Sequence, residues 1–236
     1  MTDRIEKTMT FVRRKLAENP WFQARPEAGA YRLEHTLRVA GIGREIARRE
    51  GFPVEDMVLA CLLHDVGYCR TFANGEEQMA HGRASARIAR PFLRELGLGE
   101  RETEAICFAV AVHADGQADF PGERTAFAMT VADADNIDRF GAYRLYETLE
   151  NAGFSALPPE GRLAHTEGIL GKLEEYLTID FATPSATAMW RDRIRFYREF
   201  YLRLREQLLA GGVRSGGASG TAEDAARRWM GLAGRP

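Results

Sequence analysis

The clearest chemical signal in the sequence is the pair His64-Asp65, which directly follows the apolar residues 59–63 and precedes Gly67. Burying a carboxylate or an imidazole behind such a run is costly unless a partner compensates it. A divalent cation is the strongest compensating partner, because carboxylate oxygen and neutral imidazole nitrogen are its ordinary ligands. The pair alone is weak evidence, since adjacent polar residues at a helix end often cap the helix and face water.

Four of the five histidines lie at helical spacing from apolar residues, which places them on the inward faces of predicted helices. His35, for example, is in line with Val39, Ile42 and Ile46. For a single histidine, a core imidazole hydrogen-bonded to backbone is the simpler interpretation. A shared metal site explains four such histidines more simply. The four are His35, His64, His81 and His113, and the fifth is His165.

Three aspartates within six residues interrupt a later apolar segment, after residues 127–131 and around Ile137. On a solvated helix face they would be unremarkable, but here at least one is expected to face inward. The three are Asp133, Asp135 and Asp138. The candidate ligands are therefore the four inward histidines, Asp65 and one aspartate of this cluster.

This ordered set resembles the signature of the HD-domain metal-dependent phosphohydrolase superfamily, which has a His, a His-Asp pair and a distant Asp on a helical bundle. Residues 34–39 look like its first motif, and residues 62–67 look like its second. His81 and His113 match the additional histidines of members that hold two metals. Residues 132–141 resemble the last motif, so that the resemblance covers about residues 30–150.

The resemblance implies a site for one or two divalent ions, with Mn, Fe, Zn or Mg suited to ligands that include no cysteine. Asp135 is favoured as the last ligand because it follows an alanine and precedes a polar and then an apolar residue. Asp133 also follows an alanine and stays an alternative. The aspartates that are not ligands are candidates for orienting the ligands. The implied metal ligands are His35, His64, Asp65, His81, His113 and Asp135.

The implied activity is hydrolysis of a phosphate ester or anhydride by a metal-activated water, with a small phosphorylated substrate such as a nucleotide. The residues expected to act in catalysis are Asp65, His81 and His113. Arg38 is expected to bind a substrate phosphate, although a surface ion pair with Glu34 or Glu45 is an equal alternative. Two other functions stay open: a di-iron oxygenase with the same ligand pattern, and a catalytically degenerate module that senses a ligand or acts as a scaffold.

Hydrophobic periodicity predicts an all-α fold, because no segment shows β-type alternation. Residues 19–31 are expected to form a connection, and Pro91 is expected to kink or break its helix. Residues 1–210 are predicted to form one HD-type helical domain, and residues 211–236 a flexible Gly/Ser-rich tail with one short terminal helix. The predicted helices cover residues 4–18, 32–50, 53–65, about 77–96, 100–113, 123–150, 162–177 and from 185 on.

The composition argues against several other classes of protein. With 32 basic and 34 acidic residues, the chain has no general attraction for nucleic acid or an anionic membrane. The longest apolar run, residues 105–112, is too short to cross a bilayer. Three cysteines without a CxxC spacing predict neither a disulfide framework nor a thiolate zinc site. The polar N-terminus makes export unexpected, so the cytoplasm is the expected location. A homo-oligomer is compatible with the sequence.

Overall fold

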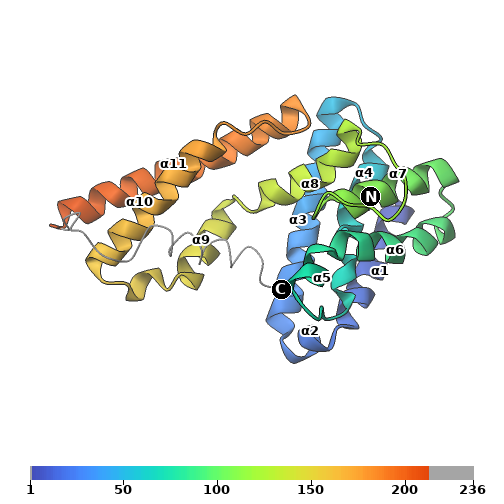
Figure 1. Ribbon diagram of the computed structural model, residues 1–236, viewed down its shortest axis with the longest axis horizontal. Coiled ribbons are helices and arrows are strands. Elements are labelled where there is room, and N and C mark those ends of the chain that lie inside the picture. The colour runs from blue at the N-terminus through green and yellow to red at the C-terminus, as the bar shows by residue number, and fades with distance from the viewer. Residues whose placement is uncertain (1, 213–236) are drawn as a thin grey trace. The chain divides into compact units, whose positions relative to one another are not determined.

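The computed structural model describes residues 2–212, and this part of the chain contains eleven α-helices, two short 3-10 helices and no strand (Figure 1). The all-α prediction is therefore confirmed. The described chain divides into two compact units. Unit 1 comprises the residues up to Asp138 together with Phe181–Ala186, and unit 2 comprises Arg139–Asp180 and the residues from Thr187 on. The assignment of residues 1–210 to one domain stays a prediction.

Unit 1 is built around α4 (Val54–Leu63). Every residue from Met57 to Leu63 is buried, so this helix is apolar all round and occupies the centre of the unit. The His-Asp pair at its C-terminal end consequently lies in the interior. The other elements of unit 1 are α1 (Asp3–Ala17), α2 (Pro20–Ala24), α3 (Pro26–Glu50), η1 (Val66–Cys69), α5 (Gly75–Met79), α6 (His81–Glu95), α7 (Glu100–Val112) and α8 (Ala126–Asp138).

The segment expected to connect the first two helices is itself mostly helical. Asn19 caps α2 by accepting a hydrogen bond from the Trp21 N–H at 2.8 Å, and Pro20 follows at the first helical position. Pro26 opens α3 in the same way, six residues before the predicted start. The expectation of a connection was wrong because Asn19-Pro20, which follows the first helix, is also a favourable start for the next one.

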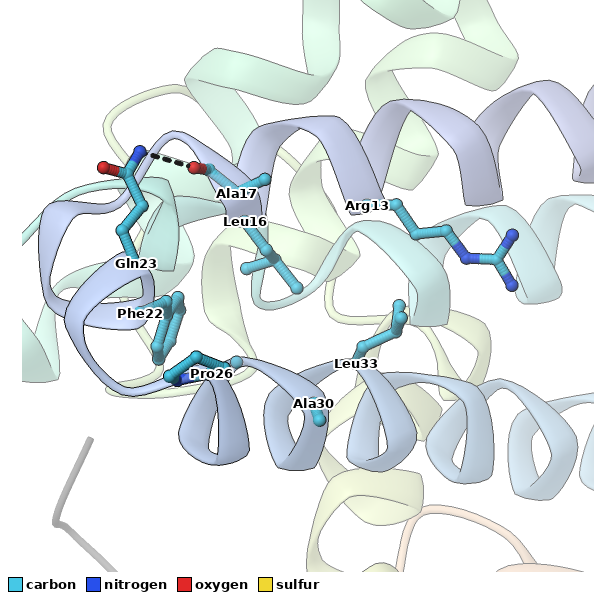
Figure 2. A pocket seen from close by; sticks show the side chains of 9 residues that line it. Arg13, Leu16, Ala17, Phe22, Gln23, Pro26, Ala30 and Leu33 are labelled. Carbon is cyan, nitrogen blue, oxygen red and sulfur yellow. Dashed lines mark hydrogen bonds between the residues drawn. The ribbon is translucent and has the colours of Figure 1, made fainter.

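A pocket of about 320 Å³ lies between α1, α2 and α3. Figure 2 shows Leu16, Phe22 and Leu33 facing this space from the three helices, with the Gln23 amide hydrogen-bonded to the Ala17 carbonyl at 2.8 Å. No candidate metal ligand lines the pocket, so it is separate from the predicted site.

Pro91 was expected to kink or break its helix; the helix does not break, because α6 is continuous from His81 to Glu95. Proline removes one N–H, which would have bonded to the carbonyl of Arg87 one turn earlier. Both Pro91 and Arg87 are exposed, so water can satisfy that carbonyl. The helix therefore tolerates proline on its solvent side.

The predicted helix over residues 123–150 is two helices, α8 and α9 (Ala142–Asn151). Gly141 is extended between them, and its carbonyl accepts a hydrogen bond from the Tyr197 hydroxyl at 3.2 Å. A Cβ at Gly141 would lie 2.5 Å from a guanidinium nitrogen of Arg193. Long-range contacts therefore fix this break, and local periodicity could not reveal it.

Unit 2 is an antiparallel arrangement of α10 (Pro159–Tyr176) and the greater part of α11 (Pro184–Ala210), preceded by α9 and η2 (Phe154–Ala156). The Trp190 indole N–H donates to the Tyr176 carbonyl at 2.7 Å. Helical spacing along α11 predicts one buried stripe, and its first five residues are buried, whereas Leu204 and Leu208 near the end of the helix are only partly buried. The five buried residues are Ala186, Trp190, Ile194, Tyr197 and Tyr201. The predicted tail lies outside the described residues apart from Gly211 and Gly212.

The three cysteines, Cys61, Cys69 and Cys107, carry free thiols, and Cys61 and Cys107 are buried. Within residues 2–212, none of the helices combines the length and apolar character needed to span a membrane.

Candidate metal centre

The carboxylate of Asp65 lies at the centre of a cluster of four histidines. Its Oδ2 is 3.3 Å from His64 Nε2 and 3.5 Å from His35 Nε2. Its Oδ1 is 3.1 Å from His81 Nε2 and 3.7 Å from His113 Nε2. The structure thus brings together side chains from α3, the ends of α4 and α7, and the start of α6.

The cluster has two halves that share Asp65. In the first half, His35 Nε2 lies 3.2 Å from Asp135 Oδ1 and 3.3 Å from His64 Nε2. In the second half, the Nε2 atoms of His81 and His113 are 3.0 Å apart. The alternative ligand Asp133 is not in the cluster, since its Oδ2 accepts a hydrogen bond from the Ala182 N–H at 2.9 Å.

Backbone carbonyls fix the tautomer of three of these histidines. In His64, His81 and His113, Nδ1 lies 2.7 Å from the carbonyl oxygen of the residue three positions earlier. A carbonyl can only accept, so each Nδ1 carries the proton and donates it. In the neutral ring, Nε2 then presents a lone pair to the centre of the cluster.

His35 has a different partner, because its Nδ1 lies 2.8 Å from Asp138 Oδ2. Asp138 in turn accepts hydrogen bonds from Arg38 Nε at 2.8 Å and Arg38 NH2 at 3.1 Å. A carboxylate behind a histidine orients the ring and raises its basicity as a ligand. The structure therefore places Arg38 on Asp138, and its contact with a substrate phosphate stays a prediction.

The electrostatics of the cluster favour ionised carboxylates. Burial opposes ionisation of Asp65, but the nearby His64 and Arg32 hold its pKa well below the ordinary value. Burial likewise acts to raise the pKa of Asp138, yet hydrogen bonds from His35 and Arg38 lower it overall. Asp65 and Asp138 are consequently ionised at neutral pH, and the ionised oxygens of Asp65 are suited to bind a cation.

This donor set fits a divalent cation. Two imidazole nitrogens that both present lone pairs, as in His81 and His113, cannot bond to each other without a proton or a cation between them. The ligand atoms of His35, His64 and Asp135 lie within 4.8 Å of one another, and so do those of His64, Asp65 and His113. Nitrogen and carboxylate donors without thiolate suit Mn, Fe, Zn or Mg.

Comparison with known proteins agrees with this geometry. Residues 32–139, which include every member of the cluster, match the HD domain family. The chain carries an HD domain. The fold of this HD-domain protein is similar to the crystal structure of a predicted HD superfamily hydrolase from an uncultured Thermotogales bacterium, with a TM-score of 0.58 and 20% identity over 86% of this chain and 91% of the other. No functionally curated protein matches the chain.

Arg32 is a residue of the HD-domain site that sequence reasoning missed. Its NH1 donates a hydrogen bond to Asp65 Oδ2, and its guanidinium carbon lies 4.0 Å from the centre of the Tyr68 ring. The residue is only 9% exposed, and its Nε has no hydrogen-bond partner. The only signal in the sequence was its position three residues before His35, on the same helix face.

The side chains of the site differ in exposure to solvent. Arg38 is the most exposed at 31%, followed by His81 (15%), Asp135 (14%) and Arg32 (11%). Those of His64 and His113 are 0% and 1% exposed. Of the two arginines, Arg38 is therefore the one that solvent reaches more readily, and Arg32 lies deeper in the site.

Gly82 allows the second half of the cluster to assemble. A Cβ at this position would lie 2.5 Å from the Ala111 carbonyl oxygen and 3.0 Å from His113 Nδ1. With glycine at position 82, the start of α6 approaches the end of α7 more closely than a residue with a side chain at this position would permit. This close approach brings the imidazoles of His81 and His113 together.

Proposed function

We propose that this HD-domain protein is a metal-dependent hydrolase of phosphate esters or anhydrides. The observation that carries the proposal is the convergence of four imidazole Nε2 atoms and the carboxylates of Asp65 and Asp135 on one interior space. A divalent ion bound there lowers the pKa of a water molecule and offsets negative charge on a phosphoryl group. The proposed ligands are His35, His64, Asp65, His81, His113 and Asp135.

The protein's own side chains hold these donors in place. Asp65 serves both halves of the cluster, one oxygen for each, so we assign it the central catalytic role together with His81 and His113. The carbonyl partners of His64, His81 and His113 place the proton of each neutral ring on Nδ1, so that Nε2 is the atom available to a cation.

Two arginines are candidates for holding the substrate phosphate. Nε and NH2 of Arg38 already donate hydrogen bonds to Asp138, so two of the three guanidinium nitrogens are engaged. Arg32 uses NH1 on Asp65, and its buried Nε has no partner. Guanidinium donors pair well with phosphate oxygens, which favours Arg32 as the contact to a small phosphorylated substrate such as a nucleotide.

Phosphate release tests the proposal directly. Metal-free protein should release no phosphate from a panel of nucleotides and phosphomonoesters, and anaerobic addition of Mn²⁺, Mg²⁺, Zn²⁺ or Fe²⁺ should restore release with at least one substrate. Asp133→Asn, which alters a buried carboxylate outside the cluster, should retain this activity, and His64→Gln should lose it. Metal-loaded protein that releases no phosphate but consumes oxygen with iron would support the oxygenase alternative instead.

A further inference from the structure

We propose that Asn19 is a positioning residue for the phosphate contact of this enzyme. It lies outside the metal cluster, at the junction of α1 and α2, and acts through the ring of Tyr68 on the guanidinium of Arg32. The inference rests on the proposed function, in which Arg32 contacts the substrate phosphate. It gives the N-terminal helices a part in substrate binding.

The side-chain amide of Asn19 joins two segments that are distant in the sequence. Its Oδ1 accepts a hydrogen bond from the Trp21 N–H at 2.8 Å, and its Nδ2 donates one to the Tyr68 carbonyl at 2.8 Å. A backbone N–H only donates and a carbonyl only accepts, so the two partners fix the orientation of the amide. Serine or aspartate would cap α2 equally well. What asparagine adds at this position is the second hydrogen bond, to Tyr68.

The Tyr68 carbonyl depends on this donor. It lies near the end of η1, where a helix has no internal partner for its last carbonyls. Asn19 is only 3% exposed, so water has little access to replace its amide. The rest of η1 is held from other sides, because the Tyr68 N–H donates to the Asp65 carbonyl at 3.0 Å and the Gly67 N–H donates to Ser85 Oγ at 2.9 Å. Asn19 therefore completes the set of hydrogen bonds that fixes the backbone of Tyr68.

The fixed backbone of Tyr68 determines where its ring lies. The ring centre is 4.0 Å from the guanidinium carbon of Arg32 and 5.0 Å from the centre of the His81 ring. An aromatic face attracts a cation without occupying any of its N–H donors. Those donors lie in the plane of the guanidinium, where NH1 bonds to Asp65 and the buried Nε has no partner. The ring thus holds the guanidinium by one face and leaves its edge for a phosphate oxygen.

Positioning and simple packing predict different results for a variant of Asn19. If Asn19 only stabilised the fold, its replacement would lower the free energy of unfolding and leave phosphate affinity unchanged. If it positions Tyr68, its replacement should weaken phosphate binding, and the loss should depend on the presence of the Tyr68 ring.

Isothermal titration calorimetry with inorganic phosphate tests the inference, on full-length protein loaded with the divalent ion that best supports phosphate release. Asn19→Ser keeps a helix cap but is too short to reach Tyr68. It should weaken phosphate binding by about 3–10-fold, the effect of losing a cation–π contact, with unchanged metal content. The KM should rise by the same factor with little change in kcat, as for a contact made equally to substrate and transition state. Asn74→Ser, at the exposed cap of α5, is the matched control and should bind phosphate as the wild type does.

Two variants of Tyr68 separate the ring from its hydroxyl. Tyr68→Phe retains the aromatic face and should bind phosphate as tightly as the wild-type protein. Tyr68→Leu removes that face and should weaken phosphate binding by about 3–10-fold. Adding Asn19→Ser to Tyr68→Leu should cause no further loss, because both changes act through the same ring.

Several outcomes would overturn the inference while leaving the proposed function intact. These are an unchanged phosphate affinity in Asn19→Ser that is folded by circular dichroism, losses that add up in the double variant, and equal affinities for Tyr68→Leu and Tyr68→Phe. If Asn19→Ser does not fold, Asn19→Asp, which retains the shape of the side chain and the cap, takes its place. A wild-type protein that releases no phosphate with any of the four metals would instead count against the proposed function.

Discussion

The two units of the molecule bury histidine in different ways. In unit 1, each of the four clustered histidines has an acceptor for Nδ1 and directs Nε2 at the other members of the cluster. In unit 2, His165 is only 7% exposed, yet its Nε2 has no hydrogen-bond partner, and its ring packs against Phe154 with centroids 5.5 Å apart. Burial alone therefore does not mark a functional histidine; an oriented ring and convergent carboxylates do.

The polar groups of the two cores differ in the same way. Unit 1 buries the carboxylates of Asp65 and Asp138, each with charged or imidazole partners. Among the described residues of unit 2, no carboxylate is fully buried, and the large polar side chains of its core are the phenols of Tyr197 and Tyr201. Burying ionised groups is costly, so their concentration in unit 1 indicates that they serve a purpose other than stability.

Asp65→Ala should have the largest effect. It removes a donor from both halves of the cluster and leaves the Arg32 guanidinium buried without its counterion. Bound metal and phosphate release should both fall below detection, and the metal-free protein should lose about 3–5 kcal/mol of unfolding free energy. Elemental analysis and denaturant melts measure these quantities; an unchanged metal content in the folded variant would exclude the cluster as the metal site.

Gly82→Ala should affect only the second half of the cluster, because its Cβ would clash with the Ala111 carbonyl. We expect a loss of about 1–3 kcal/mol in stability and weaker binding of an ion in that half. Gly41→Ala in α3 is the matched control, since an added Cβ there has no atom within 4 Å. The free energy of unfolding of the Gly41→Ala control should increase by about 0.5–1 kcal/mol. If Gly82→Ala and the wild-type protein gave the same metal-binding curves, the close approach of α6 and α7 would not be required for metal binding.

The two buried phenols of unit 2 should respond differently to loss of the hydroxyl. The Tyr197 hydroxyl donates to the Gly141 carbonyl at 3.2 Å, whereas the Tyr201 hydroxyl has no partner. Tyr197→Phe should lower the free energy of unfolding by about 0.5–1.5 kcal/mol, whereas Tyr201→Phe should leave it unchanged or raise it slightly. Urea melts of the two variants test this, and a greater loss for Tyr201→Phe would contradict the assignment of its hydroxyl. Neither change should alter metal content.

His165→Leu should have the smallest effect, confined to low pH. Burial lowers the pKa of His165, so the unfolded chain binds its proton more readily than the folded chain does. The wild-type protein therefore loses stability as the pH falls through about 6.5, the ordinary pKa of histidine. The leucine variant should lose less stability between pH 7 and pH 5, with no change in metal binding. Parallel stability curves for the two proteins would show that His165 is protonated equally in both states.

The sequence predicted those parts of the fold that depend on local pattern. The apolar run of α4 predicted a buried helix, and the helical spacing around His35 and His81 predicted inward imidazoles. These signals are local because helix amphipathicity repeats every few residues. The HD-domain resemblance then identified the set of side chains that the structure brings together.

Features that depend on distant residues were not predictable in this way. The break between α8 and α9 depends on Tyr197 and Arg193, more than fifty residues away. The burial of Arg32 depends on Asp65, which lies 33 positions further along the chain. A charged residue on a helix is ordinarily solvated, so its sequence position alone gave no reason to place it inside.

Anomalous X-ray scattering from crystals of the protein grown with Mn²⁺ or Zn²⁺ tests the central claim most directly. The account predicts an anomalous peak enclosed by Asp65, His35 and His64, at bonding distance from their ligand atoms, with a second peak beside His81 and His113. Ordered side chains at these positions with no peak, at saturating concentrations of both ions, would contradict it.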